Sequence, residues 1–397
     1  MNSFTDELNR RLAELRGQNL FRELRRVDSA QGPRIKIGGK TFLNFSSNDY
    51  LGVANHPALK ATAIKAVEKF GAGSGSSRLI CGSLAPLHEL EESLAAFKKS
   101  EAALTFSTGF AAALGTIPAL TGKDEVIILD KLVHACIVDA AKLSGAKLRV
   151  FAHNDLDDLE DKLKWARTDS RHSSFAPRHI LIVTESIFSM DGDAAPLREI
   201  VALKEKYGAW LMVDEAHATG IIGKNGRGLA GELGVSDQIE IQMGTLGKAL
   251  GASGGYICGS RALIDFLVNR ARSFIFSTAP VPAAAAAAMA GIQVARSAEG
   301  ESRRKTLFTR IGELNLNLKI KNSKLQSAIV PLILGGEPGA VAAATELRGQ
   351  NIFVPAIRYP TVARGAARLR ITLTAAHSAE DVSALARALE QIVNRKS

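Results

Sequence analysis

The central part of the chain repeats short apolar runs at a pitch of about 30 residues, and this repeat limits the possible folds more than any other feature. The runs begin at Ile180, Trp210 and Ile239. Between the first two runs, residues 196–208 have the spacing of an amphipathic helix that begins at a proline and ends at a glycine. A strand, a helix and a strand in this order predict parallel strands joined by a right-handed crossover.

We therefore expect an α/β fold with a large domain over residues 49–285, in which helices cover both faces of a mainly parallel sheet. Apolar runs at 126–129 and 148–151 predict further strands of this sheet. Residues 1–48 are expected to form an N-terminal helix and arm, because apolar residues near their start recur at helical spacing. Residues 286–397 alternate helix and strand patterns and predict a small C-terminal α+β domain.

The composition argues against several classes of protein. The chain has 50 Lys and Arg against 40 Asp and Glu, a net charge of +10, without a long basic run. This balance favours an anionic substrate or an acidic partner over a nucleic acid. The 3 cysteines form neither a disulfide framework nor a zinc pattern, so we expect a reducing, cytoplasmic location and no metal site. No apolar run reaches the roughly 18 residues of a membrane span.

The string Asp-Glu-Ala-His at 214–217 resembles the Walker B box of a nucleic-acid motor, which also needs a GxxxxGK[ST] loop upstream. The Gly-Lys-Thr string at 39–41 lacks the leading glycine, because Arg34 stands at that position, and Lys248 is followed by Ala249. The motor is therefore not favoured. A nucleic-acid binder without enzymatic activity stays as an alternative, and it predicts a DNA affinity that falls steeply with salt.

Three features occur in an order that is typical of an enzyme using pyridoxal 5′-phosphate (PLP). Residues 107–110 precede a helix pattern at 111–120, and free amides at a helix start can bind a phosphate. Asp214 ends an apolar run, where an acid can keep a pyridine nitrogen protonated, and His217 follows within reach of the ring. Lys248 comes later, in a glycine-rich turn after another run, and could bond the cofactor covalently. Taken alone, this lysine could also lie in a flexible surface turn.

At this point the chain resembles the α-oxoamine synthases over nearly its whole length. The shared motifs are FSSNDYLG (45–52), GSGSSR (73–78), TESIFSMDG (184–192), VDEAHATG (213–220) and GTLGK (244–248). The resemblance implies the PLP-dependent transferase fold of type I, with a mainly parallel seven-stranded sheet in its large domain.

The resemblance also implies a role for each residue of the cofactor site. Lys248 would hold PLP and later remove a proton from the substrate, Asp214 would pair with the pyridine nitrogen, and His134 would stack on the ring and face the substrate. Ser189 and His217 would bond the phenolic oxygen. The remaining implied contacts are with the phosphate, from Gly109, Phe110, Thr245 and, in a neighbouring subunit, Thr278.

Substrate-binding residues are implied in the same way. Arg370 would grip a carboxylate with its planar fork; Arg368 lies on the same face of the predicted strand, so the pattern alone leaves both open, and the family motif indicates Arg370. Asn48 would help to orient the substrate. Arg22 and Thr361 match positions that contact substrate, although Arg22 lies in a basic cluster that could equally be a solvated helix end.

The implied reaction is the condensation of L-alanine with a pimeloyl thioester, with loss of carbon dioxide. Segments 151–155, 356–362 and 367–377 resemble the member of the family that acts in biotin biosynthesis. Pimeloyl-CoA and pimeloyl acyl carrier protein both stay open as acyl donors. The alternative is a glycine C-acetyltransferase, which shares the fold and the catalytic residues. The family pattern further implies a homodimer with shared active sites, in which Ser277 or Thr278 completes the neighbouring phosphate site.

Overall fold

The computed structural model describes residues 3–172, 177–318 and 327–394. The chain divides into two compact units. The large unit comprises Asp49–Ser189 and Asp193–Lys305, and the small unit comprises Met1–Asn48, Met190–Gly192 and Thr306–Ser397. Among the described residues, no helix combines the length and the apolar character needed to cross a membrane.

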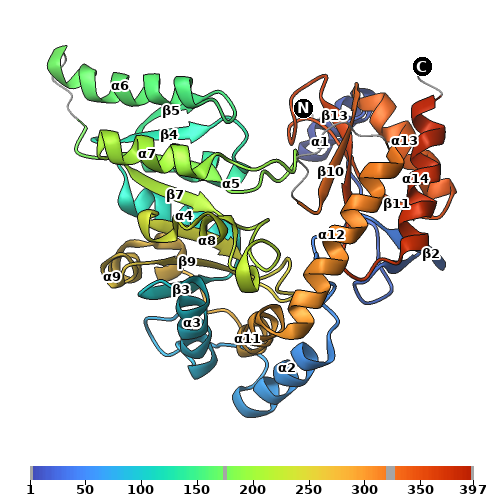
Figure 1. Cartoon of the computed structure of the whole chain (residues 1–397), viewed down its shortest axis with the longest axis horizontal. Coiled ribbons are helices and arrows are strands. Elements are labelled where there is room, and N and C mark those ends of the chain that lie inside the picture. The colour runs from blue at the N-terminus through green and yellow to red at the C-terminus, as the bar shows by residue number, and fades with distance from the viewer. Residues whose placement is uncertain (1–2, 173–176, 319–326, 395–397) are drawn as a thin grey trace. The chain divides into compact units, whose positions relative to one another are not determined.

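A seven-stranded sheet forms the centre of the large unit, in the order β3-β9-β8-β7-β6-β4-β5 (Figure 1). Only β9 runs antiparallel to its neighbours β3 and β8, and the other pairs are parallel. The mainly parallel seven-stranded sheet is therefore confirmed. Its strands are β3 (Ala102–Phe106), β4 (Val126–Asp130), β5 (Lys147–Phe151), β6 (Ile180–Glu185), β7 (Trp210–Asp214), β8 (Ile241–Thr245) and β9 (Gly255–Gly259).

Helices cover the sheet because its strands are apolar on both faces. Met212 of β7 lies in a buried core with side chains of α4, α5, α9 and α10, whereas Leu211 and Val213 alternate to the opposite face. On other sides of the unit, α6 contacts β4 and β5, α7 contacts β7, and α11 packs on α2 and α3. The helices are α2 (Pro57–Phe70), α3 (Ala85–Lys98), α4 (Gly109–Leu120), α5 (Ala135–Ser144), α6 (Leu156–His172), α7 (Leu197–Tyr207), α8 (Leu229–Leu233), α9 (Arg261–Arg270), α10 (Arg272–Ile275) and α11 (Pro282–Arg296), with short 3-10 turns η1 (Lys224–Gly226) and η2 (Ser236–Gln238).

The small unit contains two three-stranded sheets, in the orders β1-β2-β11 and β10-β13-β12. Helix α13 packs on β13, and α14 contacts α13 (Figure 1). The unit joins the segment expected as an N-terminal arm with the C-terminal part, for which an α+β architecture was expected, and the large unit extends to Lys305 rather than to residue 285. The strands are β1 (Arg34–Ile37), β2 (Lys40–Asn44), β10 (Ile329–Gly335), β11 (Ile352–Phe353), β12 (Ala356–Ile357) and β13 (Ala367–Thr372); the helices are α1 (Phe4–Gly17), α13 (Glu337–Gly349) and α14 (Ala379–Asn394), and α12 (Ala298–Leu318) spans the division between the units.

Candidate active site

Polar side chains gather where three neighbouring parallel strands end. The register pairs Glu185 of β6 with Asp214 of β7, and Asp214 with Met243 of β8. Strand β8 ends at Thr245, and Lys248 follows in the next turn. The carboxyl ends of parallel strands meet at one edge of a sheet, so the fold places two acids, a hydroxyl and a lysine close together.

The turn that carries Lys248 is shaped by close packing. Gly244 lies against Tyr256, whose hydroxyl oxygen a Cβ atom at this position would approach to 2.3 Å, so only glycine fits. Two backbone bonds close the turn, from the Leu246 amide to the Gly254 carbonyl (2.9 Å) and from the Gly251 amide to the Lys248 carbonyl (2.9 Å). The half-buried Lys248 places Nζ 2.9 Å from Nε2 of His217.

The two acids are almost fully buried beside each other. Asp214 Oδ1 accepts the Ala216 amide at 2.9 Å, and Glu185 Oε2 accepts the Ser189 amide at 3.2 Å. Burial raises the pKa of Asp214, while the positive charge of Lys248 lowers it. Burial and the charge of Asp214 together raise the pKa of Glu185 well above its usual range. Glu185 was not among the residues expected from the sequence, although an acid at the end of an apolar run is the same signal that pointed to Asp214.

The residues of the Asp-Glu-Ala-His segment at 214–217 have two separate roles, one at the strand edge and one in the packing behind it. Asp214 and His217 lie at the strand edge with Lys248, whereas Glu215 forms a buried ion pair with Lys98. Lys98 also donates to the carbonyl of Arg227, and the Ala230 amide donates to Glu215 Oε1 at 2.9 Å. Glu215 therefore stabilises the packing behind the site.

His134 begins helix α5 as its N-cap. Its Nδ1 accepts the Cys136 amide at 3.3 Å, which leaves the proton of a neutral ring on Nε2. Burial lowers the pKa of His134, and the charges of Asp214 and Lys248 also act on it. The structure therefore places a neutral imidazole close enough to Asp214 and Lys248 to interact with their charges.

The start of helix α4 and the end of β8 are packed together. A Cβ atom at Gly109 would lie 2.7 Å from Cγ2 of Thr245. Thr108 caps the helix by accepting the Ala111 amide at 3.0 Å, and the first two helical amides, of Gly109 and Phe110, have no acceptor within a helix. In the part of the chain that the structure describes, Thr245 Oγ1 is a buried hydroxyl without a hydrogen-bond partner. Two amides and a hydroxyl thus form a set of donors that fits an anion.

Ser189 and Thr278, two further residues expected to contact the cofactor, lie outside the strand ends described above. Ser189 is buried and follows β6 by four residues, with its amide on Glu185. Thr278 pairs with Ser77 in an isolated antiparallel bridge, and the neighbouring Phe276 is 70% exposed. The large unit thus contains every residue expected to contact the cofactor.

In the small unit, two arginines of β13 have different partners. Arg368 donates to the Asp191 carboxylate at 2.6 Å and to the Met190 carbonyl at 3.1 Å. Arg370 donates to the neutral side-chain oxygen of Asn48 at 3.1 Å. The charge of Arg368 is therefore balanced by an acid of its own unit, whereas Arg370 and Asn48, both expected to bind substrate, are held together.

The other two expected substrate residues also belong to the small unit. Arg22 donates to the carbonyl of Tyr359 at 3.2 Å, two residues before Thr361, and the Thr361 amide donates to the Arg358 carbonyl at 3.0 Å. Helix α1 ends at Gly17, so the interpretation of Arg22 as a helix end is wrong, because the chain is already non-helical there.

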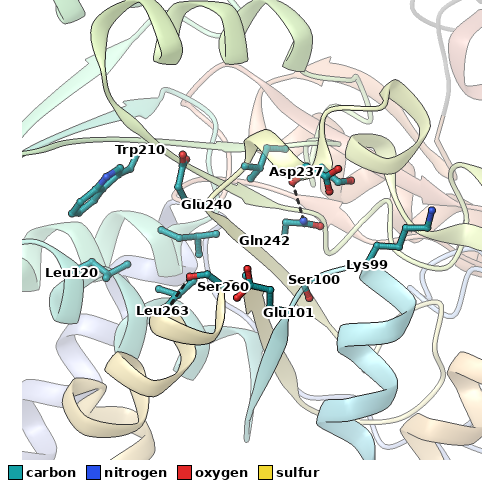
Figure 2. A pocket seen from close by; sticks show the side chains of 14 residues that line it. Lys99, Ser100, Glu101, Leu120, Trp210, Asp237, Glu240, Gln242, Ser260 and Leu263 are labelled. Atoms are coloured by element: carbon teal, nitrogen blue, oxygen red, sulfur yellow. Dashed lines mark hydrogen bonds between the residues drawn. The ribbon is translucent and has the colours of Figure 1, made fainter.

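A cavity of about 590 Å³ opens at the opposite, amino end of β7 and β8 (Figure 2). Its lining includes Trp210, Glu240 and Gln242. None of the residues that the sequence predicts for the cofactor or substrate site lines this cavity. Glu240 accepts Lys204 Nζ at 2.5 Å and the Leu211 amide at 2.8 Å, so its charge is already compensated. No group of three or more His, Cys, Asp or Glu among the described residues is placed to hold a metal ion.

Comparison with known proteins agrees with this geometry. The profile of the family described as aminotransferase class I and II matches residues 40–389. The chain therefore belongs to the class I and II aminotransferase family. Within it, the chain is 46% identical over 391 residues to the 8-amino-7-oxononanoate synthase of Anaeromyxobacter dehalogenans, covering 98% of this chain and 96% of the relative. It is 45% identical to the 8-amino-7-oxononanoate synthase of Geotalea daltonii, covering 99% and 98%.

Solved structures show the same architecture. The serine palmitoyltransferase of S. paucimobilis superposes with a TM-score of 0.90 at 29% identity, covering 98% of this chain and 97% of that chain. The 8-amino-7-oxononanoate synthase of Francisella tularensis gives a TM-score of 0.74 at 29% identity, covering 89% and 97%. The resemblance to α-oxoamine synthases and the fold of type I are thereby confirmed.

Proposed function

We propose that this protein is a PLP-dependent synthase that condenses L-alanine with a pimeloyl thioester, releases carbon dioxide and yields 8-amino-7-oxononanoate for biotin biosynthesis. One observation carries the proposal: Lys248 Nζ lies 2.9 Å from His217 Nε2, in the turn after a strand that pairs with the strand of Asp214. The relatives named above, similar over nearly their full length, support the choice of substrates.

The residues at the carboxyl edge fit PLP. When bound, PLP supplies an electron sink for charge that develops at the substrate Cα atom. The amides of Gly109 and Phe110 with Thr245 Oγ1 form a set of donors for its phosphate, which would satisfy the orphan hydroxyl of Thr245. Asp214 is the acid for the pyridine nitrogen, and a positive ring at that place would favour its ionised form despite burial.

Three further side chains orient the ring, and Lys248 moves the proton. His134, whose pKa is lowered by burial, would cover a face of the ring. Ser189 and His217 would donate to the phenolic oxygen. Lys248 Nζ would be the amine that holds PLP, and it is the base at this edge that would take the proton from the substrate Cα atom.

Substrate selection belongs to the small unit. Arg370, whose guanidinium is oriented by Asn48, binds the alanine carboxylate, because a planar fork matches two carboxylate oxygens. Arg368 does not serve this purpose, since Asp191 balances its charge. Arg22 and Thr361 contact the acyl donor, which is pimeloyl-CoA or a pimeloyl acyl carrier protein.

A second copy of the chain completes the phosphate site through Ser277 or Thr278, so the active form is a homodimer. Support comes from exposed apolar side chains on the two segments that pair here: Ile80 is 79% exposed and Phe276 is 70% exposed. Apolar surface of this kind favours association with another protein surface. The 3 cysteines are free thiols, which suits a reducing cytoplasm.

The test is product identification with purified protein. Protein loaded with PLP is mixed with alanine or glycine and with pimeloyl-CoA, a pimeloyl acyl carrier protein or acetyl-CoA, and the products are identified by mass spectrometry. We expect 8-amino-7-oxononanoate, with alanine preferred over glycine by roughly 10–200-fold, the value of one methyl group. Comparable kcat/KM for glycine and acetyl-CoA would instead show a glycine C-acetyltransferase.

A Lys248→Ala variant is the control in the same experiment. It should lose turnover and the visible absorption of the PLP-loaded protein, because the amine that binds PLP covalently is gone. Retention of both by this variant would reject the assignment of Lys248. High affinity for DNA that falls steeply with salt, without any product, would favour the nucleic-acid binder.

A further inference from the structure

A buried tyrosine lies behind the histidine that contacts Lys248. Tyr50 Oη is 2.6 Å from His217 Nδ1, and His217 Nε2 is 2.9 Å from Lys248 Nζ. Tyr50 is 0% exposed and His217 is 5% exposed. A hydrogen-bonded chain of three side chains therefore runs from the interior of the large unit to the lysine at the strand edge.

We propose that Tyr50 is a positioning residue: its hydroxyl holds the His217 ring by Nδ1, so that Nε2 faces Lys248, and it does so for either neutral tautomer of the ring. The part of the proposal that concerns catalysis rests on the proposed function. The part that concerns the ring itself depends only on the distances above.

The backbone around Tyr50 is suited to this task. The Asp49 carboxylate accepts the amides of Val53 at 2.8 Å and Ala54 at 3.0 Å, which closes the turn that carries Tyr50. Because the turn is held at both oxygens and the Tyr50 ring is fully buried, the hydroxyl is a fixed point rather than a mobile one.

The chemistry of the three groups explains why a hydroxyl is needed. A lysine ammonium only donates hydrogen bonds, so beside it His217 Nε2 accepts and the ring proton is on Nδ1, from where it is donated to Tyr50 Oη. Under the proposed function Nε2 instead donates to the phenolic oxygen of PLP, so Nδ1 must accept. A hydroxyl can accept in the first state and donate in the second, whereas a carbonyl or carboxylate could only accept.

The main experiment is a double-mutant cycle of Tyr50→Phe and His217→Ala, made with PLP-loaded protein. Tyr50→Phe should lower kcat by about 10–100-fold and weaken PLP binding by about tenfold, because the Nδ1 of a buried ring loses its partner. In the His217→Ala background the same change should alter kcat by less than about twofold, since a residue that acts through His217 has no effect without it. Equal losses in both backgrounds would overturn the proposal.

Tyr256 provides a matched control. It is also 0% exposed in the large unit, but its hydroxyl lies 2.9 Å from Thr219 Oγ1 and not from a ring nitrogen. Tyr256→Phe should leave kcat and PLP affinity within about threefold of the wild type, as loss of one neutral hydrogen bond predicts. A loss as large as that of Tyr50→Phe would show a general effect of removing a buried hydroxyl and would contradict the specific role.

If Tyr50→Phe does not fold, the role of Tyr50 can still be tested by NMR of the wild-type protein without PLP. The ¹⁵N resonances of histidine side chains report which ring nitrogen carries the proton, and those of His217 are the ones absent from the His217→Ala spectrum. We expect a single ordered tautomer protonated at Nδ1. A rapidly exchanging or mixed tautomer would overturn the role of Tyr50, and because this readout does not depend on turnover, it separates that failure from a failure of the proposed function.

Discussion

Glu240, at the amino edge of the seven-stranded sheet, lies in a different electrostatic environment from Asp214 and Glu185, at its carboxyl edge. At the amino edge, Glu240 accepts from Lys204 and from a backbone amide, next to the cavity of Figure 2. At the carboxyl edge, Asp214 and Glu185 lie side by side, almost fully buried, and the pKa of each is raised by burial. Glu240 is neutralised by permanent partners, whereas Asp214 and Glu185 are buried close to each other.

The environment of an acid separates those that stabilise the fold from those that take part in chemistry. Burying two like-charged groups destabilises the folded state unless one is neutral or a positive ligand joins them. An arrangement of this kind therefore points to a group that arrives later, whereas Glu240 is already satisfied. At the amino edge the charge of Glu240 is balanced by Lys204, so this acid leaves little for a ligand to supply.

The largest effect should follow the removal of the acid at the carboxyl edge. Asp214→Asn should allow PLP to bind but lower kcat by about three powers of ten or more, because an amide cannot keep the pyridine nitrogen protonated. The measurement is steady-state turnover together with deuterium exchange at the alanine Cα atom. Exchange at the wild-type rate would show that Asp214 does not keep the pyridine nitrogen protonated.

A second test uses the histidine between two acids at the carboxyl edge. His153 lies 3.0 Å from Asp130 Oδ1 and 2.8 Å from Asp193 Oδ2, and the two carboxylates raise its pKa to about 10 although burial opposes the charge. The folded form keeps this proton above the ordinary pKa of about 6.5, where the unfolded chain has released it. Stability from His153 should be complete below pH 6.5 and disappear as the pH rises to about 10.

The midpoint of thermal unfolding, measured from pH 6 to pH 10, checks this sign. The wild type should lose several degrees more than His153→Gln over this range, because the variant has no proton to release there. If the two proteins follow parallel curves, the ring does not carry the charge that its neighbours imply.

The amino edge should respond in stability and not in activity. Glu240→Gln removes one charged partner of the buried Lys204, which keeps Glu205 at 2.9 Å. We expect a loss of about 1 kcal/mol and a decrease of roughly 2–4 °C in Tm, with kcat unchanged. A large loss of activity would mean that the amino edge takes part in function.

The smallest effect should come from Glu185→Gln. If Glu185 is a neutral acid beside an ionised Asp214, an amide of the same size replaces it with less than about a threefold change in kcat. Glu185→Ala, which cannot accept the Ser189 amide, is the comparison and should cost more. A Gln variant as impaired as the Ala variant would show that Glu185 acts as a charge.

The sequence alone predicted the chemistry of the carboxyl edge because the residues that carry it lie in short, recognisable segments. Asp214 and Lys248 each come directly after an apolar run, so the end of the strand brings them to the same edge. Glu185 ends an apolar run as Asp214 does, so its signal was present in the sequence but was not used. Tyr50 was missed because its contact with His217 crosses 167 positions of the chain. The different partners of Arg368 and Arg370 also come from distant residues, and so only the family motif could separate them.

The pairing of β2 with β11 has a consequence for how the protein is made. Leu43 is placed against Ile352, a partner that lies about 300 residues later in the chain. At roughly 5–20 residues per second, the ribosome releases the second strand about 15–60 seconds after the first. During that interval β2 exposes an unpaired edge on a growing chain. Newborn chains should therefore depend on holding chaperones until translation is nearly complete, and slow synthesis should favour aggregation of this small unit rather than protect it.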